Sequence, residues 1–273
     1  MEDRQGREGH PHARRDAHRR GWQDRRVSAQ NQDLQVAIVT GASSGIGAEV
    51  VKALQRRGTL VVGISRTQSG ADEHELCDVA DREAVQATAA RVLERHPRID
   101  LLVNNAGVAG RTNYLDGDAE RIKLVIDVNY LGSIWTTLAF LPGLKAGSHV
   151  VNVVSVAGVF AEGPYSASKH AQLAFSRSLS AELAPRGVKV HAVLPGLIET
   201  PGFPQRPRVP GPLYRVVAHP SLVARRLLDA VDRDRREIYV PRWYRPAAWL
   251  EGLVPGLVTS VRGRTNRRPP HST

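Results

Sequence analysis

Short apolar runs rich in valine, isoleucine and leucine alternate along this chain with longer segments in which apolar residues recur every three or four positions. The short runs predict β-strands, and the longer segments predict helices. Strands are expected near 35–40, 60–65, 74–78, 100–104, 148–155, 188–194 and 237–240. Helices are expected near 46–57, 81–96, 117–140, 164–184 and 221–232. This alternation is typical of a parallel sheet with helices on both faces, so we predict a doubly wound, Rossmann-like α/β fold of about seven strands.

Two segments interrupt the alternation. The stretch 201–220, PGFPQRPRVPGPLYRVVAHP, is rich in proline and cannot form a long helix. Its composition is that of a rigid connector. The stretch 241–261 is apolar and aromatic but is interrupted by glycine and proline. We expect it to pack on the protein; the alternatives are a cover for the active site, a subunit interface and peripheral contact with a membrane.

The two ends of the chain have a different composition. Residues 1–33 offer almost nothing to bury, so we predict a disordered basic extension. A solvated tail is favoured over a basic arm for an acidic partner, because acidic residues dilute the charge. Met1 is the only methionine, and the sequence leaves open whether a mis-assigned start created this extension. Residues 263–273 predict a basic disordered tail, which leaves a single catalytic domain over 34–262.

Composition narrows the class of protein. A single cysteine, Cys77, excludes an internal disulfide and suits a reducing cytoplasm, where we expect the protein. The chain contains no run of 18 apolar residues, so its sequence predicts no transmembrane helix. The net charge of +11 raises the hypothesis of a nucleic-acid binder, but no stacking aromatics or nucleic-acid motif accompany it. We therefore expect no nucleic-acid partner, and a basic surface biased towards phosphate-bearing ligands or an anionic membrane face.

A glycine-rich turn follows the first predicted strand. The segment TGASSGIG at 40–47 lies between the apolar run LQVAIVT and the helical segment AEVVKALQRRG. Gly41 allows a tight turn, Gly45 lets the backbone approach a pyrophosphate, and Gly47 lets helix and strand pack closely. The helix N-terminus presents free N–H groups to an anion. This arrangement predicts a phosphate-binding site.

A second motif carries proton chemistry. Residues 155–169 read SVAGVFAEGPYSASK and contain Ser155, Tyr165 and Lys169. Residues four apart share one face of a helix, so the ammonium of Lys169 is expected near the phenol of Tyr165. A neighbouring cation lowers the phenol pKa from about 10, which would let Tyr165 exchange a proton near neutral pH. Ser155 ends a buried apolar run, and its hydroxyl is placed to hold a carbonyl or alcohol oxygen.

With these two motifs the chain resembles the short-chain dehydrogenase/reductase family, whose signature is TG-x3-G-x-G rather than G-x-G-x-x-G. Other motifs of the family follow in order: CDV with Asp78, NNAG at 104–107, DVNYLGS with Asn129, SVAG with Ser155, YSASK, and PG-x3-T at 195–200. Together they cover residues 36–200, and no single one would be specific.

The resemblance implies the functional residues. It implies a catalytic tetrad of Asn129, Ser155, Tyr165 and Lys169. It also implies nicotinamide-cofactor contacts from Gly41, Ser43, Ser44, Gly45, Ile46, Gly47, Asp78, Val79, Asn105, Ala106, Gly107, Tyr165, Lys169, Pro195, Gly196 and Thr200. Arg66 is a further candidate contact, from the chemistry of the second strand's end. No metal is implied.

The resemblance also implies the reaction, the interconversion of a carbonyl and a secondary alcohol by hydride transfer. Tyr165 would protonate the carbonyl oxygen, and Ser155 would hydrogen-bond it. Lys169 would lower the phenol pKa and hold the ribose hydroxyls. Asn129 would position a water that relays protons to the lysine. The substrate is a small molecule that the sequence does not identify. The alternative is a cofactor-binding sensor or scaffold without turnover.

The chain departs from the family at one point and follows its assembly pattern at another. Nine residues separate Ser155 from Tyr165, where the family usually has about a dozen. The loop 156–163, which normally walls the substrate pocket, is therefore short, and we expect a more open or differently shaped pocket. The family also places a substrate lid directly after the position of Thr200, so the resemblance implies a lid as the alternative to a rigid connector for 201–220. The family commonly forms dimers or tetramers through the helices expected at 117–140 and 164–184. The apolar content of the first helix supports a homodimer or homotetramer.

The end of the second predicted strand bears on the choice of cofactor. An NAD site needs a carboxylate there to accept the ribose hydroxyls. This chain has Ser65 followed by Arg66, whose guanidinium suits a 2′-phosphate. Thr67 and Ser43 add hydroxyl donors. We therefore predict a preference for NADP(H), with NAD(H) as the alternative.

Overall fold

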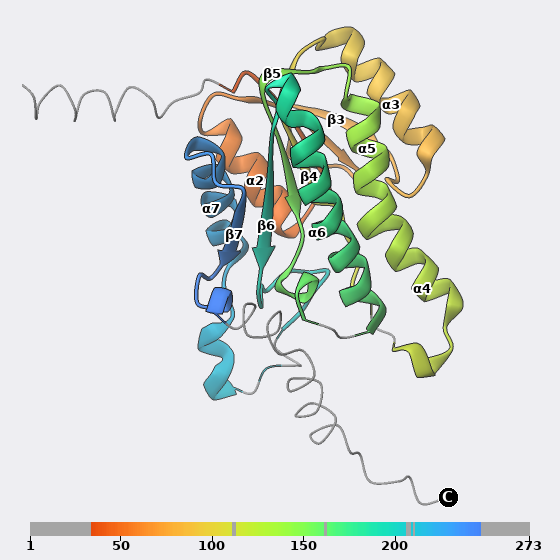
Figure 1. The fold of residues 1–273 in the computed structure, drawn as a ribbon, viewed down its shortest axis with the longest axis vertical. Helices are drawn as coiled ribbons and strands as arrows, with labels where there is room; N and C mark the ends of the chain where they lie inside the picture. Colours follow the sequence, from red (N-terminus) through yellow and green to blue (C-terminus); the bar gives the residue numbers. More distant parts are fainter. Residues whose placement is uncertain (1–33, 111–112, 161–162, 206–208, 210, 247–273) are drawn as a thin grey trace, which may run out of the picture. The chain divides into compact units, whose positions relative to one another are not determined.

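Seven parallel strands form one sheet in the order β3-β2-β1-β4-β5-β6-β7 (Figure 1). The structure is a computed structural model, and it describes residues 34–246 apart from 111–112, 161–162, 206–208 and 210. The strands are β1 Val36–Thr40, β2 Leu60–Ser65, β3 Glu73–Leu76, β4 Ile99–Asn104, β5 Leu144–Val153, β6 Lys189–Pro195 and β7 Glu237–Val240. The predicted doubly wound α/β fold is therefore confirmed.

The α-helices lie close to their expected positions. They are α2 Gly45–Gln55, α3 Arg82–Arg95, α4 Ala119–Ile126, α5 Gly132–Phe140, α6 Gly163–Leu183 and α7 Pro220–Asp232. Short helical turns occur at η1 Tyr114–Asp116, η3 Val156–Gly158, η4 Ala184–Arg186 and η5 Gly211–Val216. The single helix expected over 117–140 is divided, because a π-helical turn, η2 Asp127–Leu131, lies between α4 and α5. Such turns are rare and occur often at functional sites.

The sheet is buried on both faces, which explains why its central strands read as continuous apolar runs. Along β1, Ala37 and Val39 pack with residues of α2 and α7. The alternate residue Ile38 packs with residues of α3, α5 and α6 on the opposite face. Figure 1 shows these two helical layers on either side of the sheet. Because side chains alternate between the faces of a strand, a run of consecutive apolar residues supplies both cores.

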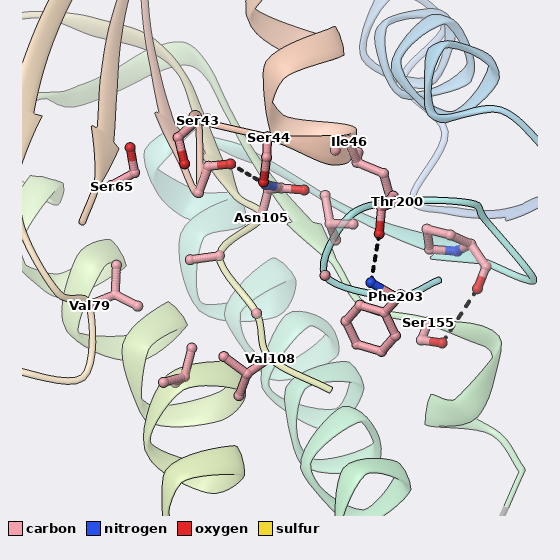
Figure 2. Close-up of a pocket in the computed structure, with 18 of the residues that line it drawn as sticks. Ser43, Ser44, Ile46, Ser65, Val79, Asn105, Val108, Ser155, Thr200 and Phe203 are labelled. Atoms are coloured by element: carbon pink, nitrogen blue, oxygen red, sulfur yellow. Dashed lines mark hydrogen bonds between the residues drawn. The ribbon is translucent and has the colours of Figure 1, made fainter. Parts of the chain in front are cut away.

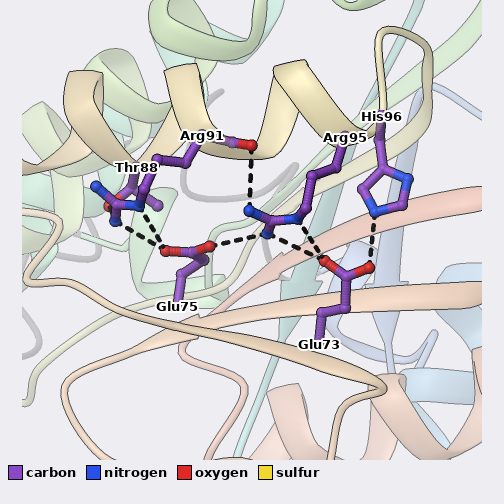
Figure 3. Close-up of polar contacts among 6 residues, drawn as sticks. All are labelled: Glu73, Glu75, Thr88, Arg91, Arg95 and His96. Carbon is purple, nitrogen blue, oxygen red and sulfur yellow. Dashed lines mark hydrogen bonds and ion pairs between the residues drawn. The ribbon is translucent and has the colours of Figure 1, made fainter.

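The edge strand β3 is held by charge rather than by apolar packing. Glu73 and Glu75 face α3, where Arg91, Arg95 and His96 contact them (Figure 3). The Glu75 carboxylate lies 2.8 Å from the guanidinium of Arg91 and 2.8 Å from that of Arg95. Burial alone would raise the pKa of Glu75, but these hydrogen bonds outweigh it and lower the pKa. The cluster therefore fixes the sheet edge that lies beside β2.

The carboxyl ends of β1, β4, β5 and β6 meet where the order of strands reverses, which is where ligands bind in open sheets of this type. β5 ends at Val153 rather than near 155, because the Ser155 side chain accepts a hydrogen bond from the Ala157 amide and starts η3. The predictions for 1–33, 247–261 and 263–273 lie outside the described residues. Within the described part of the chain, no helix is long and apolar enough to cross a membrane.

Candidate active site

A cleft runs along the carboxyl ends of the strands and brings together most of the predicted site residues (Figure 2). Its lining includes the predicted residues Gly41, Ser43, Ser44, Gly45, Ile46, Arg66, Asp78, Val79, Asn105, Ala106, Gly107, Ser155, Tyr165, Lys169, Pro195, Gly196 and Thr200. Two predicted residues, Gly47 and Asn129, lie behind this lining. The sequence therefore placed almost all of these residues in one cavity.

The glycine turn closes the cleft at the start of α2. Gly41 adopts a φ of +65°, a conformation that favours glycine. A Cβ at Gly47 would lie 2.1 Å from the carbonyl oxygen of Gly41, so α2 can approach β1 only without a side chain there. Ser44 precedes α2 without capping it through its side chain. The first turn of α2 therefore offers backbone N–H groups to an anion.

Asn105 fastens the end of β4 to this turn. Its amide nitrogen donates to the carbonyl oxygens of Thr40 at 3.0 Å and Gly41 at 3.2 Å. The Thr40 hydroxyl accepts from the backbone amides of Asn105 and Ala106, both at 3.0 Å. Asn105 thus lines the cleft while its side chain supports the phosphate-binding turn. Thr200 approaches the same turn from β6, because a Cβ at Gly45 would lie 3.2 Å from its side chain.

The far end of the cleft, beyond β2, is polar. The Arg66 guanidinium is mostly exposed and lies 3.9 Å from the Asp78 carboxylate. Asp78 also accepts a hydrogen bond of 3.0 Å from the Ala80 amide, which fixes its side chain. The Ser65 hydroxyl donates to the Thr67 carbonyl oxygen at 2.7 Å and is therefore turned back onto the backbone. Arg66 is held only loosely, so its side chain can turn towards a ligand.

The Tyr165 and Ser155 side chains both line the cleft, and the Ser155 hydroxyl acts to lower the pKa of the Tyr165 phenol. The Ser155 hydroxyl also lies 3.4 Å from the Pro195 carbonyl oxygen, which ties it to the end of β6. Burial of the phenol oxygen raises the pKa of Tyr165 to about 12, although the hydrogen bond with Ser155 acts in the opposite direction. The phenol is therefore protonated at neutral pH and can donate its proton.

The structure differs from the expectation that Lys169 lowers the pKa of Tyr165. The Lys169 ammonium donates to the Val153 carbonyl oxygen at 3.1 Å and to the Gln172 side-chain oxygen at 2.7 Å. Desolvation is the largest influence on the phenol, and it raises the pKa of Tyr165 instead of lowering it. Burial likewise lowers the pKa of Lys169 to about 7.

Asn129 lies inside the π-helical turn and is fully buried. Its side-chain oxygen accepts from the Val108 amide at 2.8 Å, and its nitrogen donates to the Val108 carbonyl oxygen at 3.1 Å. The same nitrogen lies 3.2 Å from the Ser168 hydroxyl. Asn129 therefore braces the loop after β4 against α6, next to Lys169, rather than projecting into the cleft.

The sequence did not single out the residues that wall the cleft opposite Tyr165. Phe203 packs its ring against that of Tyr165 at a centroid distance of 5.4 Å. A tight turn holds it, because its backbone amide donates to the Thr200 side-chain oxygen at 3.1 Å. Gln205 also lines the cleft. Its backbone amide donates a hydrogen bond of 2.9 Å to the Glu199 carboxylate. These contacts favour the lid over the connector for the start of 201–220.

The described start of the apolar segment 241–261 packs on the protein, as expected. Tyr244 is buried against Gly196, and its hydroxyl accepts a hydrogen bond of 3.4 Å from the Leu197 amide. Trp243 stacks on Tyr244 with a centroid distance of 3.8 Å and is half exposed. This packing supports the end of β6 and the start of the loop after it, where Pro195 and Thr200 line the cleft.

The chain is similar to known dehydrogenases and reductases. The family model described as short chain dehydrogenase matches residues 35–208. A dehydrogenase/reductase SDR family member 7B of Xenopus tropicalis is 32% identical over 268 residues, which cover 87% of this chain and 83% of that protein.

The chain is also similar to solved structures of dehydrogenases. A short chain dehydrogenase from Burkholderia cenocepacia J2315 in complex with NADP is 29% identical, has a TM-score of 0.73 and matches 84% of this chain and 97% of its own. The aldohexose dehydrogenase of Thermoplasma acidophilum is 25% identical, has a TM-score of 0.67 and matches 76% of this chain and 92% of its own. With the family model matched across the glycine turn, the tyrosine and the lysine, this chain belongs to the short-chain dehydrogenase/reductase family of oxidoreductases, which use nicotinamide cofactors.

Proposed function

We propose that this protein is an NADP(H)-dependent oxidoreductase that interconverts a carbonyl and a secondary alcohol. The observation that carries the proposal is that Ser155, Tyr165 and Lys169, the last one helical turn after Tyr165, line a single cleft that begins at the glycine turn. An acid, a hydroxyl that holds an oxygen and a cation are what reduction of a carbonyl requires.

The residues of the cleft fit a nicotinamide dinucleotide. The uncapped N-terminus of α2 and the side-chain-free approach at Gly45 suit a pyrophosphate. Asp78 and Val79 would face the adenine, and Thr200 would meet the carboxamide. When bound, the nicotinamide supplies or accepts a hydride.

The chain's own residues manage the proton. Tyr165, with a pKa raised to about 12 by burial, holds its proton at neutral pH and donates it to the carbonyl oxygen of the substrate. The Ser155 hydroxyl hydrogen-bonds the same oxygen and keeps it beside the phenol. As the phenolate forms, the nearby cation of Lys169 stabilises the new negative charge. In the oxidative direction these roles reverse.

The preference for NADP(H) rests on the end of β2. Position 65 carries a serine and no carboxylate, and the Ser65 hydroxyl donates a hydrogen bond to the Thr67 carbonyl oxygen. The Arg66 guanidinium is exposed and lies 3.9 Å from Asp78, so a 2′-phosphate can draw it away from that carboxylate. The NADP complex of the Burkholderia relative is consistent with this choice.

The test is a panel of carbonyl compounds with NADPH and with NADH, followed by absorbance at the reduced nicotinamide band. Tyr165→Phe keeps the ring and removes the proton donor, so turnover should fall about 10²–10⁴-fold while the cofactor still binds. A Tyr165→Phe variant that keeps most of the activity would show that another group is the acid. Binding of NADPH without turnover of any substrate would instead support the sensor.

A matched pair of arginines tests the choice of cofactor. Arg66→Ala should raise the KM for NADPH much more than that for NADH, and this difference should shrink as salt screens the phosphate contact. Arg56 is exposed and lies outside the cleft, so Arg56→Ala should leave both values unchanged. Equal effects of Arg66→Ala on the two cofactors would refute the proposed role.

We also propose a homo-oligomer. The exposed face of α5 carries Leu138, whose side chain is more than half exposed in the single chain. Apolar side chains on this helix are what a subunit interface would cover. Sedimentation at micromolar concentration should show a dimer or tetramer, whereas a fully active monomer would contradict the proposal.

A further inference from the structure

Lys169 is buried, and its ammonium has its shortest described contact with Gln172 rather than with any group in the cleft. The distance from the Lys169 ammonium nitrogen to the Gln172 side-chain oxygen is 2.7 Å. Gln172 lies one turn further along α6 and has no exposed surface. A buried, neutral acceptor at this distance interacts strongly with an ammonium, because the surroundings are poor in water.

A second hydrogen bond fixes which end of the Gln172 amide faces the lysine. The Gln172 side-chain nitrogen lies 2.7 Å from the Ser133 hydroxyl of α5. That hydroxyl lies 3.3 Å from the Asn129 carbonyl oxygen, to which it donates its only proton. Ser133 must therefore accept from the amide nitrogen of Gln172, and the amide oxygen is left to face Lys169.

The backbone of Gln172 is held as firmly as its side chain. Its carbonyl oxygen accepts a hydrogen bond of 2.7 Å from the Ser176 hydroxyl. Ser176 in turn accepts one of 2.9 Å from Asn152 of β5. The nitrogen of Asn104 of β4 donates to the Asn152 side-chain oxygen at 2.8 Å. This buried network connects Gln172 to two central strands, so its amide is preorganised.

The groups around Lys169 offer it no negative charge. Among the described residues, burial is the cause that lowers its pKa, and no carboxylate acts on it. The titratable neighbours on its own helix are Tyr165, one turn earlier, and the exposed His170, which is bonded to the Ser166 carbonyl oxygen. From β5 and the loop after β4 the neighbours are the Val153 carbonyl oxygen and the backbone of Gly107. The Gln172 dipole is thus the side-chain group that opposes desolvation of the ammonium.

We propose that Gln172, oriented by Ser133, is a positioning residue that keeps Lys169 protonated and holds its ammonium in place at the wall of the cleft. This inference rests on the proposed function, in which Lys169 acts as a cation. It also explains why the position carries an amide. A carboxylate there would hold the ammonium in an ion pair, and an apolar side chain would remove the nearer of its two described acceptors and leave the Val153 carbonyl oxygen.

The test reads the titration of Lys169 directly. The chain has five lysines, Lys52, Lys123, Lys145, Lys169 and Lys189, so NMR of protein labelled with carbon-13 at the lysine ε-carbon gives few signals. Lys169→Arg assigns the signal of interest by its loss. The titration is recorded on the full chain, both alone and with saturating NADPH, and it does not depend on turnover. A missing substrate would therefore leave this test intact, even if the proposed function failed.

Two substitutions move the pKa in opposite directions. Gln172→Met keeps the length of the side chain and removes the strong acceptor, so the pKa of Lys169 should fall by about 1–2 pH units. Gln172→Glu introduces a carboxylate, so the pKa should rise by at least as much. Ser133→Ala should shift it downward by less, because the amide stays but loses its orientation. The alkaline limb of the kcat profile should move with each titration.

Thr136→Val is the matched control. Thr136 is buried like Gln172, and the side-chain hydrogen bond described for it stays within α5, to the Gly132 carbonyl oxygen at 2.7 Å. Its removal should lower stability without moving the titration of Lys169. An unchanged Lys169 titration in Gln172→Glu, or in a folded Gln172→Met, would overturn the proposal. If Gln172→Met does not fold, Gln172→Glu decides alone.

Discussion

Replacing Gly47 with alanine tests whether the close approach of α2 to the glycine turn creates the cofactor site. The added Cβ would lie 2.1 Å from the Gly41 carbonyl oxygen and 2.5 Å from the side-chain nitrogen of Asn105. Non-bonded heavy atoms are most stable roughly 3.5 Å apart, so the turn or the helix must move by about 1 Å. Movement of Gly41 would also break the hydrogen bond of 3.2 Å from Asn105.

The size of the effect follows from this overlap. Overpacking of this kind costs about 1–3 kcal/mol. If the strain is relieved by opening the turn, binding must restore the turn, and the affinity for the cofactor falls about 5- to 150-fold. If the strain is relieved by displacing α2, the same free energy is lost from stability. Fluorescence titration with NADPH and unfolding in urea separate these two outcomes.

Gly70→Ala is the control, because a Cβ there meets no atom within 4 Å and the backbone is not in the left-handed region. It should bind NADPH and unfold as the unmodified protein does. A Gly47→Ala protein that matches Gly70→Ala in both assays would refute the reasoning. It would show that the turn adapts without cost and that the approach of α2 does not define the site.

Three further predictions concern the lid, the interior of the sheet and its edge. Phe203→Ala removes the ring that packs on Tyr165 at 5.4 Å, so the ratio of kcat/KM for bulky over small carbonyls should rise about tenfold; an unchanged ratio would exclude a selective wall. Burial lowers the pKa of His149, which lies 2.9 Å from His191, to about 4. Because this folded-state pKa is below the unfolded value, the stabilisation is complete above pH of about 6.5 and is lost as the pH falls towards 4, by up to about 3 kcal/mol. Unfolding in urea should show this loss between neutral and acidic pH, and His149→Asn should weaken the dependence; an identical pH dependence in the variant would contradict the assignment. Arg95→Ala breaks contacts with two glutamates but removes a half-exposed side chain, so it should cost less than about 1 kcal/mol in the same assay, and a loss twice as large would show that the cluster acts as a unit.

The local features of the cleft could be predicted from the sequence because they depend on neighbours along the chain. The turn at Gly41 requires a residue that tolerates positive φ, and the glycine at this position meets that requirement without help from the rest of the fold. The spacing of Tyr165 and Lys169 places both on α6. Strands buried on both faces must be apolar throughout, so their order along the chain and their parallel arrangement were predictable as well.

The electrostatics of the site depended on the tertiary structure. The sequence predicted that Lys169 lowers the pKa of Tyr165, whereas burial raises this pKa and Gln172 engages the lysine. Desolvation is a property of everything that surrounds a group, so the spacing of two residues cannot supply it. The orientation of the Gln172 amide depends on Ser133, which is 39 residues away in sequence and adjacent only after α5 packs beside α6.

The sequence by itself therefore determined most of the residues that reach the cleft, because periodicity and backbone conformation are local. The tertiary structure alone decided what those residues can do there. It packed the Phe203 ring against the phenol. It also placed Asn129 in the π-helical turn, where its side chain binds the Val108 backbone and does not enter the cleft. Contacts between segments far apart in the chain set burial and hydrogen-bond direction, and these in turn set the protonation of Tyr165 and Lys169.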